Sequence, residues 1–268
     1  MTTLVAMPFR GAPELLGRAV ESVLAQTDRD LVCMVLGDGV PVPELGVRDD
    51  RLVTATWPGH HGPPFLQQAM LLGSPHEHYA PFGADDFADP DHLELMGSYG
   101  RPNVCAGAVW WHKGADAPVD HVLPEDWASG ARRNYEVGRF TAADLRSVGG
   151  YGAHERFGQD NLLLHILART LGLVASDRPT YHRIRRPGSL TTEPATGLRS
   201  PAREAVRHRN WDLVHRLRAR NLIASAPVRA PIRADRLERL RAFRAEMLPR
   251  PVRAELEDAA AAVSRLLA

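Results

Sequence analysis

Short continuous apolar runs alternate, over roughly the first 195 residues, with stretches whose apolar residues recur at helical spacing. Continuous apolar runs are typical of strands buried on both faces, and their alternation with helices favours a mostly parallel sheet between helical layers. We therefore predict an α/β fold with a Rossmann-like sheet. The predicted strands are 3–7, 31–36, 51–55, 78–82 and 104–111, and the clearest helices are 13–24, 63–72 and 160–171.

The pattern changes after Pro194. Residues 203–224, 235–248 and 251–267 have helical periodicity and are rich in arginine, with proline between them. We predict two domains, an α/β domain over 1–195 and a helical appendage over 196–268.

Charge is distributed unevenly between these two parts. Residues 203–268 carry fifteen arginines against eight acids, a net +7, so the first 202 residues carry −6 of the total of +1. The appendage can pack on its own domain or on a second subunit as a homodimer, lie on an anionic membrane, or approach nucleic acid. Because acids are interspersed with the arginines and the front of the chain is acidic, we favour packing.

Neither a membrane span nor a signal peptide is indicated. No apolar run reaches the roughly 18 residues that a spanning helix needs, and no basic segment followed by an apolar stretch stands at the N-terminus. The expected location is the cytoplasm, with peripheral attachment to a membrane as an alternative. Cys33 and Cys105 lie inside apolar runs and are expected in the core.

Polar residues follow two of the predicted strands. Gly37-Asp38-Gly39 follows the second strand and Asp85-Asp86 follows the fourth. Ligands bind at the carboxyl ends of strands in such sheets. Adjacent carboxylates repel each other, which favours a bound cation there, although an exposed turn would also contain this pair.

The order of these segments resembles the family 2 glycosyltransferases of GT-A fold. The resemblance covers about residues 3 to 192. The segments that carry it are 5–10, 19–27, 35–39 and 83–86 in the first half, and 139–151, 157–162 and 186–191 in the second.

This resemblance implies an inverting hexosyl- or pentosyl-transferase that uses a nucleoside-diphosphate sugar and a divalent metal, Mn²⁺ or Mg²⁺. A hard divalent cation would stabilise the departing diphosphate. Asp85 and Asp86 match the end of the family's metal-binding motif, while Gly83 stands in place of its first carboxylate. His182 is a further candidate ligand.

Asp160 matches the catalytic base of the family, which deprotonates the acceptor. A helix N-cap is the alternative role for an Asp at this place. Gln159 replaces a Glu that often precedes this Asp, and it is assigned to acceptor binding.

Other matches concern the donor. The donor-binding candidates are Pro8, Phe9, Arg10, Asp38, Gln67 and Asp85, and those of the diphosphate loop are Arg185 and Arg186. Gly37 stands where the family's base-reading acid is common, and Gln67 stands where many relatives carry a phosphate-binding Arg. A UDP-sugar is favoured by family analogy.

Aromatic residues lie in the segment that is expected to bind the acceptor. Trp110 and Trp111 are candidates, with Trp127 further along, and one of the adjacent pair should face the cleft because strand neighbours point to opposite faces. Residues 112–138 suit an acceptor-binding loop. Saccharide, lipid-linked glycan, natural product, protein and modified nucleic acid all stay open as acceptors.

Two other functions compete with this one. A catalytically degenerate binding module is favoured by the family side chains that are missing at Gly37, Gln67, Gly83 and Gln159. A sugar nucleotidyltransferase would have a similar sheet, but residues 9–13 match its glycine-rich loop poorly.

Overall fold

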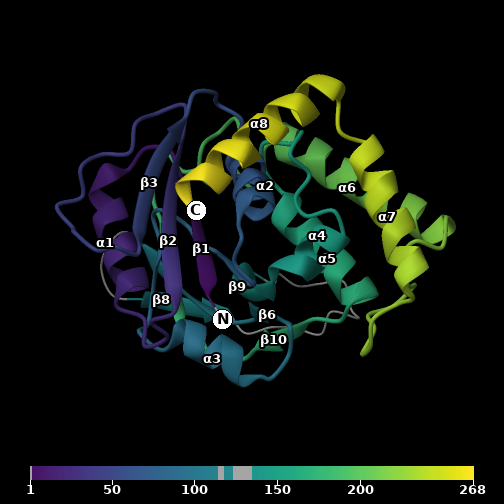
Figure 1. The fold of residues 1–268 in the computed structure, drawn as a ribbon, viewed down its shortest axis with the longest axis horizontal. Helices are drawn as coiled ribbons and strands as arrows, with labels where there is room; N and C mark the ends of the chain where they lie inside the picture. The colour runs from purple at the N-terminus through teal and green to yellow at the C-terminus, as the bar shows by residue number, and fades with distance from the viewer. Residues whose placement is uncertain (1, 114–117, 123–134) are drawn as a thin grey trace.

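A computed structural model of the chain describes residues 2–113, 118–122 and 135–268 (Figure 1). Its central sheet has seven strands in the order β10-β6-β9-β4-β1-β2-β3, and β9 alone runs antiparallel to its neighbours. These strands are β1 (Thr3–Phe9), β2 (Leu31–Asp38), β3 (Leu52–Trp57), β4 (His78–Pro81), β6 (Asn103–Ala106), β9 (Tyr135–Thr141) and β10 (Val174–Ser176). The prediction of a mostly parallel α/β sheet is confirmed.

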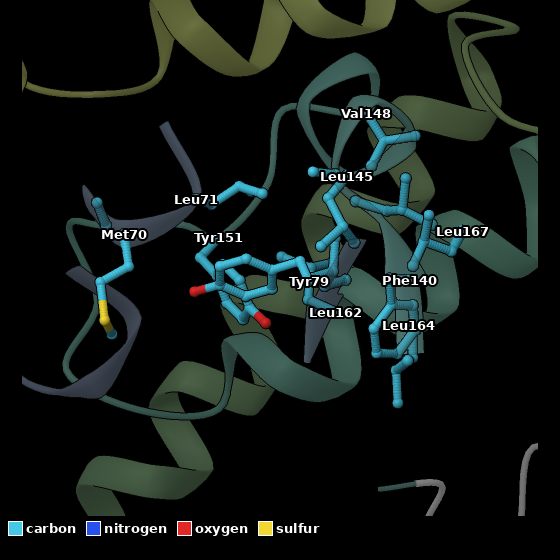
Figure 2. Close-up of a cluster of buried hydrophobic side chains, with 14 of the residues drawn as sticks. Met70, Leu71, Tyr79, Phe140, Leu145, Val148, Tyr151, Leu162, Leu164 and Leu167 are labelled. Atoms are coloured by element: carbon cyan, nitrogen blue, oxygen red, sulfur yellow. The ribbon is translucent and has the colours of Figure 1, made fainter. Parts of the chain in front are cut away.

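Helices cover both faces of this sheet. Their bounds are α1 (Pro13–Leu24), α2 (Pro63–Gly73), α3 (His92–Ser98), α4 (Ala142–Ser147), α5 (Gln159–Thr170), α6 (Pro201–Ala219), α7 (Ala234–Glu246) and α8 (Arg250–Leu266). Strand β1 has a continuous apolar run because successive residues are buried in two different cores. Leu4 and Ala6 belong to the core beneath α2, α5 and the C-terminal helices, whereas Val5 and Met7 belong to the core beneath α1 and α3. Figure 2 shows part of the first core.

A second sheet of four strands lies beside the first, in the order β5-β11-β7-β8. Its strands are β5 (Phe87–Ala88), β7 (Val109–Lys113), β8 (Pro118–Val122) and β11 (Tyr181–Arg185). The single predicted strand 104–111 is therefore wrong, because β6 and β7 belong to different sheets. The chain leaves the first sheet at Gly107, whose N–H donates to Ser176 O. The run 104–111 is apolar through both strands, so its sequence carries no signal of this change.

The C-terminal helices pack on the α/β part of the same chain. Leu213 and Leu217 of α6, Leu240 of α7 and Leu256 of α8 are buried in the core that also contains Leu4. Helix α8 lies along α2 (Figure 1). This agrees with the packing interpretation of the arginine-rich region. Within the described residues, no helix has the length and apolar character to cross a membrane.

Candidate active site

A cleft of about 410 Å³ opens where β1, β2 and β4 end and β11 passes. The sheet brings together side chains that lie far apart in the sequence, because parallel strands end at one edge. The predicted residues that line it are Pro8, Phe9, Arg10, Asp38, Gln67, Asp85, Asp86, Trp111, Gln159, Asp160 and Arg186.

Three predicted residues do not line this cleft, namely Trp110, His182 and Arg185. His182 bonds through Nε2 to Asp89 Oδ1 at 3.0 Å and through Nδ1 to His112 Nε2 at 2.9 Å, and its ring stacks on Phe87. It therefore lies away from Asp85 and Asp86. Trp111 lines the cleft and Trp110 does not, as the alternation of a strand predicts. Trp127 lies outside the described residues.

Asp86 is almost fully buried in the turn between β4 and β5. Its Oδ1 accepts the Ile184 N–H at 2.9 Å and its Oδ2 accepts the Tyr181 hydroxyl at 3.0 Å, so it ties this turn to β11. Arg183 Nε lies 3.8 Å from Oδ2. Burial, and next the negative charge of Asp85, raise the pKa of Asp86 to about 7.

Asp85 is more exposed and pairs with arginine. Arg186 Nε donates to its Oδ2 at 3.1 Å. A side chain at Gly83 has no room, because a Cβ there would lie 2.5 Å from Asp86 Oδ2. The crowding gives a steric reason why glycine stands at the position of the first carboxylate in the metal-binding motif that this segment resembles.

The two carboxylates suit a metal site that substrate phosphates complete better than a site built from protein ligands alone. Among the described residues, no group of three His, Cys, Asp or Glu is placed to hold a metal ion. Magnesium at nucleotide sites is commonly held by one or two carboxylates together with substrate phosphates. Asp85 and Asp86 are the carboxylates that such a site would use, and a bound cation would oppose the mutual repulsion that contributes to the raised pKa of Asp86.

Asp160 lies in the first turn of α5. The N-cap is Gly158, in the left-handed conformation with φ 76°, so the interpretation of Asp160 as the N-cap is wrong. Its Oδ1 is buried and has no hydrogen-bond partner among the described residues. A buried oxygen without a partner is costly in a folded protein, and a catalytic role is one of the reasons for which such a cost is kept. A carboxylate at this position also gains from the helix dipole.

Sequence reasoning missed a further carboxyl group in the cleft, that of Glu136 of β9. Burial, and next the negative charge of Asp160, raise the pKa of Glu136 well above its ordinary value. The cleft therefore brings the carboxyl group of Glu136 close enough to Asp160 for their charges to interact. Gly138 and Arg139 interrupt the alternation of apolar and polar residues over 135–141, so periodicity does not indicate this strand.

Arg203 of α6 was also missed, because it belongs to the C-terminal region. It lines the cleft, its guanidinium lies 4.6 Å above the ring of Phe157, and it donates to the carbonyl oxygens of Thr196 and Leu190. Burial lowers the pKa of Arg203, and the negative charge of Asp160 opposes this. Helix α6 thus contributes directly to the cleft, which no pattern in the sequence indicated.

The carboxylate of Asp38, at the end of β2, is hydrogen-bonded to the backbone of the protein itself. Its Oδ1 accepts the His61 N–H at 2.8 Å and its Oδ2 accepts the Gly62 N–H at 3.0 Å, while Arg10 donates to its backbone carbonyl at 2.8 Å. Gln67 is likewise buried, and its amide bonds Ala6 O and the Tyr79 hydroxyl. Both residues line the cleft, and their side chains are hydrogen-bonded within the protein.

No family model and no curated protein matches the sequence. Solved structures do match. TarS from S. aureus has a TM-score of 0.54 at 12% identity over 99% of this chain, which spans 55% of that one. TarS 1–349 in complex with UDP-GlcNAc has a TM-score of 0.55 at 11% identity, and the match covers 100% of this chain and 82% of that chain.

A third match is the mannosyltransferase PcManGT from Pyrobaculum calidifontis, in complex with GDP-Man and Mn²⁺. Its TM-score is 0.58 at 14% identity, over 99% of this chain and 84% of that chain. At such low identity these likenesses establish the fold and do not extend to substrates. The chain has a glycosyltransferase fold of GT-A type, with a mostly parallel seven-stranded sheet between helices.

Proposed function

We propose that this chain is an inverting glycosyltransferase that moves a sugar from a nucleoside-diphosphate sugar to an acceptor, with Asp160 as general base. The observation that carries the proposal is the buried, unpartnered Oδ1 of Asp160 in the same cleft as Asp85, Asp86, Arg183 and Arg186. The solved structures of similar fold, bound to UDP-GlcNAc and to GDP-Man with Mn²⁺, support a nucleotide-sugar donor.

In this reaction the acceptor hydroxyl gives its proton to the Asp160 carboxylate. The acceptor oxygen forms a bond to the anomeric carbon as the bond to the diphosphate breaks, which inverts that carbon and releases a nucleoside diphosphate. A neutral hydroxyl is a weak nucleophile, and a placed carboxylate contributes on the order of 10²–10⁴-fold.

Negative charge builds on the leaving diphosphate. Arg183 and Arg186 lie beside the carboxylates at the end of β4 and can pair with phosphate oxygens in a bidentate manner. A divalent cation, when bound by Asp85 and Asp86, would supply further charge neutralisation. UDP-sugars and GDP-sugars are the first donors to test.

Replacement of Asp160 by Asn tests the base. The change keeps the size of the side chain and removes only the proton acceptor, so the fold and nucleotide affinity should be kept. We expect the release of UDP from UDP-GlcNAc, or of GDP from GDP-mannose, to fall by about two to four orders of magnitude. Release and nucleotide affinity are measured with and without Mn²⁺, the second by calorimetry.

Ser98→Ala, on the exposed end of α3, is a control that should leave both quantities unchanged. Near-normal turnover of Asp160→Asn would remove Asp160 from the reaction.

A binding module without turnover is the second candidate. It is favoured by the internal use of Asp38 and Gln67, whose polar groups are bonded to the protein itself. A parent chain that binds UDP or GDP tightly, yet releases neither from its sugar with or without Mn²⁺, would support this module.

A further inference from the structure

The chain segment just before Asp160 is held by α6 of the C-terminal region. Asn210 Nδ2 donates to the carbonyl of Gly158 at 2.8 Å, and Asn210 Oδ1 accepts from Gln159 Nε2 at 3.1 Å. One amide thus fixes the N-cap of α5 and the first residue of its first turn. Asp160 is the next residue along the chain.

Two neighbouring contacts hold the same segment. Arg209 makes two bonds to the Glu155 carboxylate, at 2.7 and 2.9 Å, and Arg203 lies over the ring of Phe157. A Cβ at Gly158 would lie 3.2 Å from Val206, so α6 also packs closely against the turn.

Three of the four contacting residues of α6 lie on the same face as its buried residues. Arg203, Val206 and Asn210 are three and four residues apart, and the apolar residues Leu213 and Leu217 continue the same stripe into the core. The face that anchors α6 to the protein is therefore the face that contacts residues 155–159. A displacement of α6 would displace the turn that carries Asp160.

We propose that α6 is a positioning element for the general base, with Asn210 as its main positioning residue. The proposal rests on the function of Asp160 proposed above. Asn210 acts through Gly158 and Gln159. A misplacement of a reacting group by about 1 Å can cost on the order of 100-fold in rate, so a single hydrogen-bonded amide at this place has a large effect on turnover.

A double-mutant cycle separates positioning from a general structural role. Asn210→Ala removes both hydrogen bonds, and we expect it to lower the single-turnover release of nucleoside diphosphate by about ten-fold or more. In the Asp160→Asn background, Asn210→Ala should lower this release rate by less than about two-fold, because there is no base left to position. The affinity for UDP or GDP should stay the same in all four proteins.

Arg209→Gln is a second variant, chosen because Arg209 is exposed and its loss does not threaten folding. It should lower the release rate in the same direction and by a smaller factor. Asp212→Asn, an exposed position of the same helix, is the matched control and should change nothing.

An equal loss of rate from Asn210→Ala in both backgrounds would overturn the proposal, and so would an unchanged rate in the parent background. If the parent neither binds UDP or GDP nor releases either from its sugar, the proposed function itself fails, which is a different result.

Discussion

At the scale of single residues, the buried histidine His92 makes the fold sensitive to acid. It is 1% exposed, and its Nδ1 lies 2.8 Å from the Thr180 hydroxyl. Burial lowers the pKa of His92 to about 4, although the negative charge of Asp91 opposes the shift. The folded chain therefore binds fewer protons than the unfolded chain between pH 6.5 and 4. Stability from this group is present above pH 6.5 and lost as the pH falls towards 4, by at most about 3 kcal/mol.

His92→Gln should flatten the dependence of the free energy of unfolding on pH between 6.5 and 4, as measured by urea unfolding at several pH values. Some slope should remain, because burial and then the charge of Arg169 lower the pKa of His165 to about 4 as well. His208→Gln, at an exposed site on α6, is the control for loss of one imidazole. An identical slope in parent and His92→Gln would contradict the prediction.

At the scale of elements, two helical glycines predict opposite effects of the same substitution. A Cβ at Gly73, the last residue of α2, would lie 2.3 Å from Ala260 O and 2.8 Å from Val263 Cβ on α8. Gly73→Ala should therefore force α8 away from α2 and destabilise the chain by about 1–3 kcal/mol.

Gly17, inside α1, has open space around a Cβ, so Gly17→Ala should stabilise the chain by about 0.5–1 kcal/mol. Thermal and urea unfolding measure both. A neutral or stabilising Gly73→Ala would mean that α8 does not pack closely on α2.

At the scale of the whole molecule, the C-terminal helices are part of the main core. Leu217, Leu240 and Val263 are buried against it, and the Arg244 guanidinium is buried with bonds to the carbonyls of Val148 and Gly150. Truncation after Pro194 would expose the apolar surfaces of α2 and α5. We expect an insoluble or markedly less stable protein, judged by soluble yield and thermal unfolding.

Truncation would also remove Arg203 and Asn210 from the cleft and from the turn before Asp160. A truncated chain that stays soluble, equally stable and fully active, yet loses binding to anionic vesicles or DNA, would mean that the C-terminal region is a targeting arm instead of a packed layer.

Much of the fold was determined by local pattern. The continuous apolar runs of β1 and β2 predict strands buried on both faces, and the structure places alternate residues such as Leu4 and Val5 in two different cores. The position of Asp85-Asp86 after an apolar run likewise predicts a site at a strand end. These features could be predicted because burial and strand direction leave a periodic mark on nearby residues.

Tertiary structure alone decided which side chains are free to act. Asp38 lines the cleft but is bonded to the backbone of residues 61 and 62, and His182 is turned towards Asp89 instead of Asp86. Asn210, some fifty residues after Asp160, holds the turn that precedes it. Each outcome depends on contacts between segments distant in the sequence. Periodicity reports that a residue is buried, but it carries no information on which distant partner buries it or which hydrogen bonds that partner makes.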